Sequence, residues 1–203
     1  PSADIAVVND GSSDRTAAIA GSRGVILLSH PYNMGIGSTM QTGYKYAHMK
    51  GYDVAVQVDA DGQHPAEQIA QLIRPVVENR ADIVVGSRFL GEGSYRPSLA
   101  RGAGMAFFPS LVSLIIKEQV TDTTSGFRAA GKECIEFFAK RYPDDYPEVE
   151  ALVLLHKKGF SIMEIPVSMS ERSTGRSSIT PARSIYYMVK VLLAILVDLM
   201  KKI

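Results

Sequence analysis

The sequence predicts one α/β domain built around a mostly parallel sheet, and two observations lead to this fold class. Short β-branched runs alternate with longer helical patterns through the first half of the chain, which is typical of βαβ units. These runs are nearly continuous in apolar residues, as expected for strands that helices cover on both faces. With 203 residues the chain can bury one substantial core, and a second full domain is not expected.

Four strands and three helices are expected in the first half of the chain. The expected strands are DIAVVN, VILLS, DVAVQVD and DIVVGS, at residues 4–9, 25–29, 53–59 and 82–87. The expected helices cover residues 14–22, 37–50 and 65–79. Pro65 suits a first helical turn, where a missing N–H costs nothing, whereas Pro75 should kink or shorten the helix that contains it.

The second half is less regular and ends in an apolar segment. The expected elements are helices at 99–117, 131–141 and 148–158, a strand at 162–167 and a last helix at 181–203. The α/β domain is therefore expected to cover residues 1–180. Four of the five charged residues of the last helix fall on one narrow stripe, so we expect it to be amphipathic and not to span a membrane; they are Arg183, Lys190, Asp198 and Lys201. It either packs on the domain, lies on a membrane or docks with an integral membrane partner.

Composition and charge narrow the class of protein. Hydrophobic residues make up 46% of the chain and charged residues 21%, which is typical of an ordinary globular domain. Cys134 is the only cysteine, so no intramolecular disulfide can form and a reducing compartment is expected. The net charge is +1, but residues 172–203 hold six basic residues and one acidic residue. This basic tail favours a diphosphate, a lipid phosphate or an acidic membrane surface as partner, with a solvated helix face as the alternative and no nucleic acid expected.

The strongest local motif is Asp59-Ala60-Asp61-Gly62-Gln63, which follows the third expected strand. Ligands of open α/β sheets bind at the carboxyl ends of strands. Two carboxylates separated by one residue can share Mg²⁺ or Mn²⁺, and the carboxamide of Gln63 can add an oxygen. The alternative is an acidic turn that caps the helix starting at Pro65. His64 is expected only to lead into that helix.

Two further strand-to-helix turns are candidate ligand contacts. Asp10 ends the first strand, where its carboxylate can accept a hydrogen bond from a nucleoside ring N–H or a ribose hydroxyl. An ordinary turn, with Gly11 at its bend, is the alternative there. In Asn33-Met34-Gly35-Ile36-Gly37 the two glycines allow a backbone to approach a ligand closely, although the spacing does not match a dinucleotide fingerprint.

The motifs together resemble those of family 2 glycosyltransferases. VVNDGSSDRT, NMGIGSTMQTGYKYA, VQVDADGQHP, IVVGSRF, DTTSGFRA and the ER-STGRSS segment occur in the order and approximate spacing of that family. The chain is most similar to dolichyl- and polyprenyl-phosphate sugar synthases, over nearly its whole length. The resemblance implies a GT-A fold, a nucleotide-binding α/β sheet, for residues 1–180. Family members normally begin with a strand that carries a Pro-x-Tyr-Asn-Glu type motif; that motif is absent here, so a first strand and helix are expected to be missing.

The resemblance also implies roles for individual residues. It makes Asp10 a nucleoside contact, places Gly35 and Ala60 beside the donor, and makes Asp59, Asp61 and Gln63 the metal and diphosphate set. Arg88 is expected near the transferred or accepting phosphate, and the segment 125–128 on the acceptor side. Arg172 and Ser177 are expected in a basic loop that closes on the donor diphosphate. Glu150 is the candidate general base for a hydroxyl acceptor, although it could equally cap or orient its helix.

These residues predict a metal-dependent transferase that moves a sugar from a nucleoside-diphosphate sugar to an acceptor, and the resemblance implies that it inverts the anomeric centre. The resemblance favours polyprenyl phosphate over a glycan as acceptor, in cell-envelope glycan or glycolipid synthesis at the cytoplasmic face of the membrane. One alternative is a sugar nucleotidyltransferase, which would release pyrophosphate. The other is a degenerate nucleotide-binding scaffold that acts through its last helix.

Overall fold

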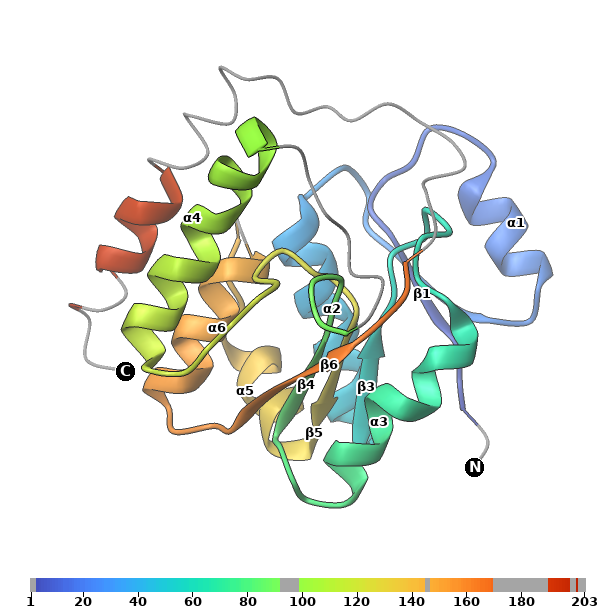
Figure 1. The fold of residues 1–203 in the computed structure, drawn as a ribbon. Coiled ribbons are helices and arrows are strands. Elements are labelled where there is room, and N and C mark those ends of the chain that lie inside the picture. The colour runs from blue at the N-terminus through green and yellow to red at the C-terminus, as the bar shows by residue number, and fades with distance from the viewer. Residues whose placement is uncertain (1–2, 92–98, 145–146, 170–189, 198–199, 201–203) are drawn as a thin grey trace.

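A computed structural model describes residues 3–91, 99–144, 147–169, 190–197 and 200, and Figure 1 shows its strands flanked by helices. The elements of the first half are β1 (Ala6–Asn9), α1 (Thr16–Ser22), β2 (Ile26–Ser29), α2 (Ile36–Lys50), β3 (Val54–Gln57), the 3₁₀ turn η1 (Ala66–Gln68), α3 (Ile69–Val77) and β4 (Ile83–Ser87). Those of the second half are α4 (Leu99–Ile116), β5 (Arg128–Gly131), α5 (Lys132–Lys140), α6 (Pro147–Lys157) and β6 (Ile162–Pro166). Residues 190–197 are also helical.

The strands form a four-stranded sheet in the order β3-β5-β4-β6 and a separate pair, β1-β2. β1 and β2 are parallel, as are β4 and β6, while β5 runs antiparallel to both of its neighbours. Because β3 and β4 are each antiparallel to β5, they run in the same direction. Their carboxyl ends therefore meet at one edge of the sheet, where the motifs that follow them lie.

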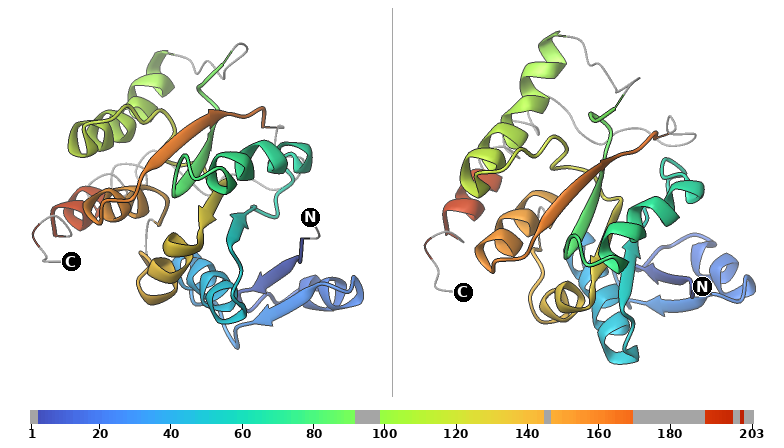
Figure 2. Two further views of the ribbon diagram at one scale, coloured as in Figure 1. Left: turned by 90° about the horizontal axis from the view of Figure 1, so that it is seen from below. Right: turned by 60° about the horizontal axis from the view of Figure 1, so that its bottom comes forward.

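Helices cover both faces of the four-stranded sheet, and β4 is buried along its whole length. On one face Val84 packs with Leu72 and Val76 of α3. On the other face Ile83 joins a cluster with α2, α5 and α6, and Val85 joins one with α4 and α6. Figure 2 shows α3 on one side of these strands and α5 and α6 on the other. This explains why β4 is an unbroken apolar run in the sequence.

The described part of the last helix packs on the domain. Val191 and Ile195 are almost fully buried in the cluster that α4 and α6 form. Leu193 and Leu196 on the same helix keep more than half of their surface exposed. One of the expected alternatives, packing on the domain, is therefore present, and an apolar face remains outward. Residues 181–189, 198–199 and 201–203 lie outside the described residues, and no described helix has the length and apolarity needed to cross a membrane.

Most expected elements are present within one or two residues, and one strand was not expected. β5 is a central strand, although its sequence, Arg-Ala-Ala-Gly, lacks the β-branched and aromatic residues typical of strands. The expected helix at 65–79 begins as η1 and ends at Val77, with Pro75 inside its last turns. The expectation that Pro75 shortens this helix agrees with that end point.

The β1-β2 pair presents an open edge toward β3. The backbone carbonyls of Ile5 and Asn9 accept hydrogen bonds from the backbone N–H groups of Ile26, in β2, and His30, directly after it. In a parallel pair the backbone groups of alternate residues point in opposite directions. Those of Ala6 and Val8 therefore point away from β2 and have no strand partner among the described residues.

β3 has a matching open edge. In β5 the backbone groups of alternate residues point to β4 and to β3 in turn. Those that point to β3 lie opposite Ala55 and Gln57, so these two residues form the hydrogen-bonded pairs between β3 and β5. The backbone groups of Val54 and Val56 then point away from β5, toward β1. Among the residues that the structure describes, the apolar strands β1 and β3 therefore each turn a row of backbone groups without a strand partner toward the space between them.

A cavity of about 250 Å³ separates the two edges. It is lined by Ala6 and Val8 of β1, Val54 and Val56 of β3, and residues of α2 that include Tyr44. A hydrogen bond from the Tyr52 hydroxyl to Asp4 joins the starts of the two strands. No described residue tests the strand expected upstream of residue 4, so it stays a prediction. The edges of β1 and β3 that face this cavity are open to such a strand.

The open edges predict an alternating pattern of amide exchange in the chain of residues 1–203. The amides of Ala6, Val8, Val54 and Val56 should exchange with solvent at least 10-fold faster than those of Val7 and Asn9 in β1 and Ala55 and Gln57 in β3, because only the second set is hydrogen-bonded. Residue-resolved hydrogen exchange by NMR measures this. Uniform protection along both strands would show that the edges are paired in solution.

Candidate active site

The acidic turn follows β3 directly. The backbone N–H of Gln63 donates to Oδ1 of Asp61 at 3.0 Å, and Gly62 has a φ of 76°, which permits the tight turn. The side chain of Asp59 is 44% exposed. The residue before η1 is Pro65, and no side chain caps that turn. The acidic turn therefore lies directly before η1, at the carboxyl edge of the sheet.

The donor chemistry of this turn fits a hard divalent cation. Two carboxylates and a carboxamide supply only oxygen, and magnesium sites in phosphate-binding enzymes commonly use one or two carboxylates together with substrate phosphates. Among the described residues no group of three His, Cys, Asp or Glu side chains could form an all-protein cage. Asp59 and Asp61, with Gln63, are thus the residues that would hold such an ion, and phosphate oxygens would complete its coordination.

His64 holds Asp59 in place, a role that the sequence did not indicate. Its Nδ1 accepts the backbone N–H of Asp59 at 3.0 Å, and its ring stacks on Phe127 with centroids 4.9 Å apart. Its Nε2 lies 3.9 Å from Oδ2 of Asp59. Burial lowers the pKa of His64 more than the charges of Asp59 and Asp61 raise it, so the ring is neutral at pH 7 with its proton on Nε2. The available signal was a histidine beside a proline, five residues after the first aspartate.

Gly126 brings a second segment against the acidic turn. A Cβ at Gly126 would lie 2.6 Å from Oδ2 of Asp59, so any larger residue would displace this carboxylate. The next residue, Phe127, lies under His64. The segment 121–128, which leads into β5, therefore forms one wall of the turn.

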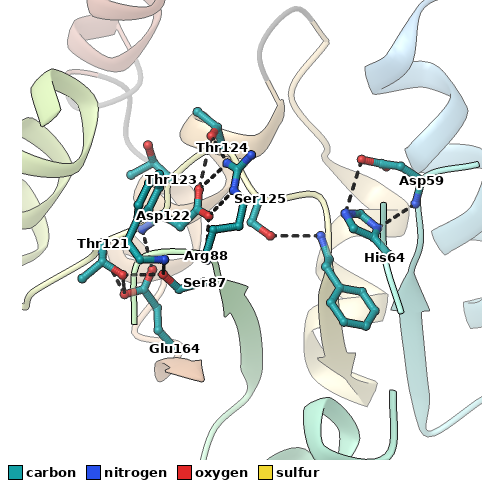
Figure 3. Close-up of polar contacts among 12 residues, drawn as sticks. Asp59, His64, Ser87, Arg88, Thr121, Asp122, Thr123, Thr124, Ser125 and Glu164 are labelled. Carbon is teal, nitrogen blue, oxygen red and sulfur yellow. Dashed lines mark hydrogen bonds and ion pairs between the residues drawn. The ribbon is translucent and has the colours of Figure 1, made fainter. Parts of the chain in front are cut away.

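Arg88 follows β4 and is held by Asp122 of the same segment (Figure 3). Its Nε donates to Oδ2 of Asp122 at 2.7 Å and its Nη2 to Oδ1 at 2.8 Å. Nη2 also donates to Oγ1 of Thr124 at 2.7 Å. The side chain of Arg88 is 30% exposed, while that of Asp122 is 1% exposed. This bidentate geometry fixes the plane of the guanidinium at the edge of the sheet.

Asp10 organises the loop before α2. Its Oδ1 accepts the backbone N–H of Met34 at 2.8 Å and contacts Nδ1 of His30 at 2.7 Å, and its Oδ2 accepts the N–H of Gly35 at 2.9 Å. Burial alone would raise the pKa of Asp10, but the bonds from Met34, His30 and Gly35 together outweigh it and lower that pKa. The nucleoside contact expected of Asp10 stays a prediction, and the loop contacts are what the structure adds.

The two glycines of the 33–37 motif serve different purposes. Gly35 has a φ of 93°, a conformation that favours glycine, and its N–H goes to Asp10. A Cβ at Gly37 would lie 2.2 Å from the carbonyl oxygen of Pro143. At Gly37 the close approach is to the protein's own backbone.

The remaining expected residues lie on α6 or outside the described part of the chain. Glu150 is 8% exposed in the first turn of α6. The start of this helix is tied to the segment 121–128 by Arg128, whose Nη2 donates to the carbonyl of Glu148 at 2.7 Å. Arg172 and Ser177 lie outside the described residues.

Comparison with known proteins assigns this constellation to a family. The model of the family described as glycosyl transferase family 2 matches residues 1–136, about two thirds of the chain. The chain belongs to that family. The expected family and enzyme class are thereby confirmed, and a sugar nucleotidyltransferase is no longer favoured.

Curated relatives of this glycosyltransferase act on lipid phosphates, according to their names. The UDP-N-acetylglucosamine--dolichyl-phosphate N-acetylglucosaminyltransferase of Methanococcus voltae is 32% identical over 186 residues, covering 80% of this chain and 73% of that protein. The polyprenol monophosphomannose synthase of Mycolicibacterium smegmatis is 28% identical over 201 residues, covering 94% of this chain and 76% of that protein.

Solved structures of the same fold support the expected GT-A architecture. Glucosyl-3-phosphoglycerate synthase from Mycobacterium tuberculosis, in complex with Mn²⁺, UDP-glucose and phosphoglyceric acid, superposes with a TM-score of 0.65 at 18% identity. The match covers 95% of this chain and 67% of that one. Mannosyl-3-phosphoglycerate synthase from Rubrobacter xylanophilus gives a TM-score of 0.67 at 18% identity, covering 95% and 63%.

The contacts of Asp10 predict a pH-dependent contribution to stability. Because its pKa is lowered in the folded state, Asp10 stabilises the fold above its unfolded pKa, near 3.8, and this stability is lost as the pH falls through the folded value. Asp10→Asn should lower the free energy of unfolding by about 1 kcal/mol at neutral pH, and less as the pH drops below about 4. Urea unfolding across this range measures it, with the exposed Asp53→Asn as control. A pH-independent difference would contradict the role of the charge.

Proposed function

We propose that this glycosyltransferase moves a sugar from a nucleoside-diphosphate sugar to a polyprenyl phosphate, using Mg²⁺ or Mn²⁺ bound at Asp59, Asp61 and Gln63. The observation that carries the proposal is the shared edge of the sheet. The acidic turn ends β3, Arg88 ends β4, and the segment 121–128 contacts both of them. The names of the relatives, which include dolichyl-phosphate and polyprenol-phosphate enzymes, support a lipid phosphate as acceptor.

The reaction needs charge stabilisation more than a strong base. An oxygen of the acceptor phosphate attacks the anomeric carbon, a new C–O bond forms, and the bond to the diphosphate breaks with its electrons passing to the leaving group. A single displacement of this kind inverts the anomeric centre. A divalent ion at the acidic turn would offset the charge that develops on the diphosphate. Arg88, Arg172 and Ser177 would bind phosphate oxygens.

The acceptor decides whether Glu150 takes part in chemistry. A phosphate monoester is already ionised near neutral pH, so its oxygen needs no general base to become a nucleophile. A sugar hydroxyl would need one, and Glu150 is the candidate for that role. With polyprenyl phosphate as acceptor, no proton has to be removed from the attacking oxygen. Glu150 then takes no part in proton transfer and serves to orient α6.

Asp61→Asn tests the proposed metal set. This variant keeps the size of the side chain and removes the charge that a divalent ion requires, so metal-dependent transfer should fall by at least about 100-fold while the fold is kept. Label transfer from a panel of nucleotide sugars to polyprenyl phosphate in the organic phase measures it, with Mn²⁺ present. Asp53→Asn, at the opposite end of β3, is the control. Wild-type turnover of the Asp61 variant would refute the role.

We further propose that the protein works at the inner face of the membrane, where the last helix meets lipid. Leu193 and Leu196 are 58% and 55% exposed, and Val197 and Met200 are exposed as well. Exposed apolar side chains on a helix beside a basic tail are typical of peripheral attachment to anionic membranes. An integral membrane partner that covers the same face would give the same exposure and is distinguished by the test.

Replacing Leu193 and Leu196 together by Gln should weaken binding to vesicles of anionic lipid by about 30-fold, because the two side chains each lose roughly 1 kcal/mol of apolar burial. Vesicle co-sedimentation measures this. Met49→Gln on α2, also highly exposed, is the matched control. If the double variant binds vesicles as the wild type does, lipid is not what covers this face.

A further inference from the structure

Glu164 is a charged side chain in the middle of β6 that the proposed reaction does not use. Its Oε2 accepts the backbone N–H of Thr121 at 2.7 Å and the Thr121 hydroxyl at 2.8 Å. Its Oε1 accepts the backbone N–H of Asp122 at 2.8 Å. Both oxygens of one carboxylate therefore bind two consecutive residues more than 40 positions earlier in the chain.

One of the two residues that Glu164 binds, Asp122, holds Arg88 (Figure 3). Glu164 fixes the backbone at Asp122, and the Asp122 carboxylate receives three bonds from Arg88: the backbone N–H at 3.1 Å, Nε at 2.7 Å and Nη2 at 2.8 Å. Thr121 in turn shares a 2.6 Å hydroxyl contact with Ser87, the residue before Arg88. The chain of contacts runs from β6 through the segment 121–122 to the end of β4.

The pairing of Arg88 with Asp122 serves to orient the guanidinium more than to add positive charge to the site. Asp122 offsets the charge of Arg88, so the pair adds little positive field at the site. A guanidinium held through Nε and Nη2 has one fixed plane, and its N–H groups have fixed directions. A lysine or an unpaired arginine would supply more charge and less direction.

We propose that Glu164 is a positioning residue for phosphate binding, acting through Thr121 and Asp122 to set the plane of the Arg88 guanidinium. This inference rests on the proposed function, in which Arg88 meets the accepting or transferred phosphate. Small displacements of an aligned group can lower the rate by up to about 100-fold, so the loss of this support should be measurable. The same contacts also join β6 to the segment 121–122, and the experiment must separate the two roles.

Glu164→Gln is the informative change, because it keeps the shape but can accept only one of the two backbone N–H bonds. With polyprenyl phosphate as acceptor, kcat/KM for the acceptor should fall by about 10- to 100-fold, and KM for the nucleotide sugar should change by less than about 2-fold. In an Arg88→Lys background, which lacks the planar fork, the same change should cost less than about 3-fold. Equal losses in both backgrounds would show a general structural role and overturn the proposal.

A second readout does not depend on activity. The Arg88 Nε–H signal in ¹⁵N NMR should be sharp and slow to exchange in the wild type, and broadened or lost in Glu164→Gln. If no donor or acceptor is turned over, this signal still tests positioning, so failure of the proposed function and failure of this inference are distinguishable. An unchanged Nε–H signal would overturn the inference.

Two further variants guard against misfolding and nonspecific effects. Thr121→Val keeps the side-chain volume and removes only the hydroxyl bonds to Glu164 and Ser87, so it should give a smaller loss in the same direction. Glu136→Gln, on the exposed face of α5, removes a carboxylate that pairs only at the surface with Lys140 and serves as the control. No effect of Thr121→Val on either readout would contradict the chain of contacts.

Discussion

The candidate site depends on the close approach of the segment 121–128 to the ends of two strands. On one side Gly126 lies so near Asp59 that a single added carbon would collide with its carboxylate. On the other side Asp122 binds Arg88 through two side-chain bonds. One stretch of backbone therefore sets where the acidic turn and the arginine lie relative to each other. Because β5 follows this stretch and lies between β3 and β4, the sheet itself fixes the spacing.

The buried side chain of Arg128 bonds to the backbone of this segment and links it to α6. The side chain is 1% exposed, yet it donates to three carbonyl oxygens, those of Ser125, Thr123 and Glu148. A buried guanidinium is stable only when its donors are paired, so the loop must keep the shape that presents these carbonyls. The first turn of α6, which carries Glu150, is thereby held to the same framework as Arg88 and Asp59.

The parts of the fold that follow from local sequence were predictable, and the parts that follow from distant pairing were not. Apolar runs such as residues 82–87 identify buried strands, and glycine and acidic residues after them identify the ligand edge. β5 escaped prediction because Arg-Ala-Ala-Gly has no strand-forming character and is a strand only because β3 and β4 bond to it on both sides. The roles of Glu164 and His64 were not predicted for a related reason. Glu164 contacts Asp122 and His64 contacts Phe127, and no local sequence pattern indicates contacts between residues so far apart in the chain. An acidic residue within the apolar run of β6 was the one available sign.

The division of the sheet bears on how the donor would be held. Asp10 ends β1 and the acidic turn ends β3, so a nucleotide that contacted both would bridge the cavity between the two sheets. Among the described residues, α2 is the main connection across it, through contacts to both strands and through Tyr44, which packs against Phe138 and Tyr142. A helix packed on one face restrains the strands less than backbone hydrogen bonds on a shared edge would. In the described residues no strand joins Ala6 and Val8 to Val54 and Val56, so the distance between Asp10 and the acidic turn depends on the packing of α2 against both strands.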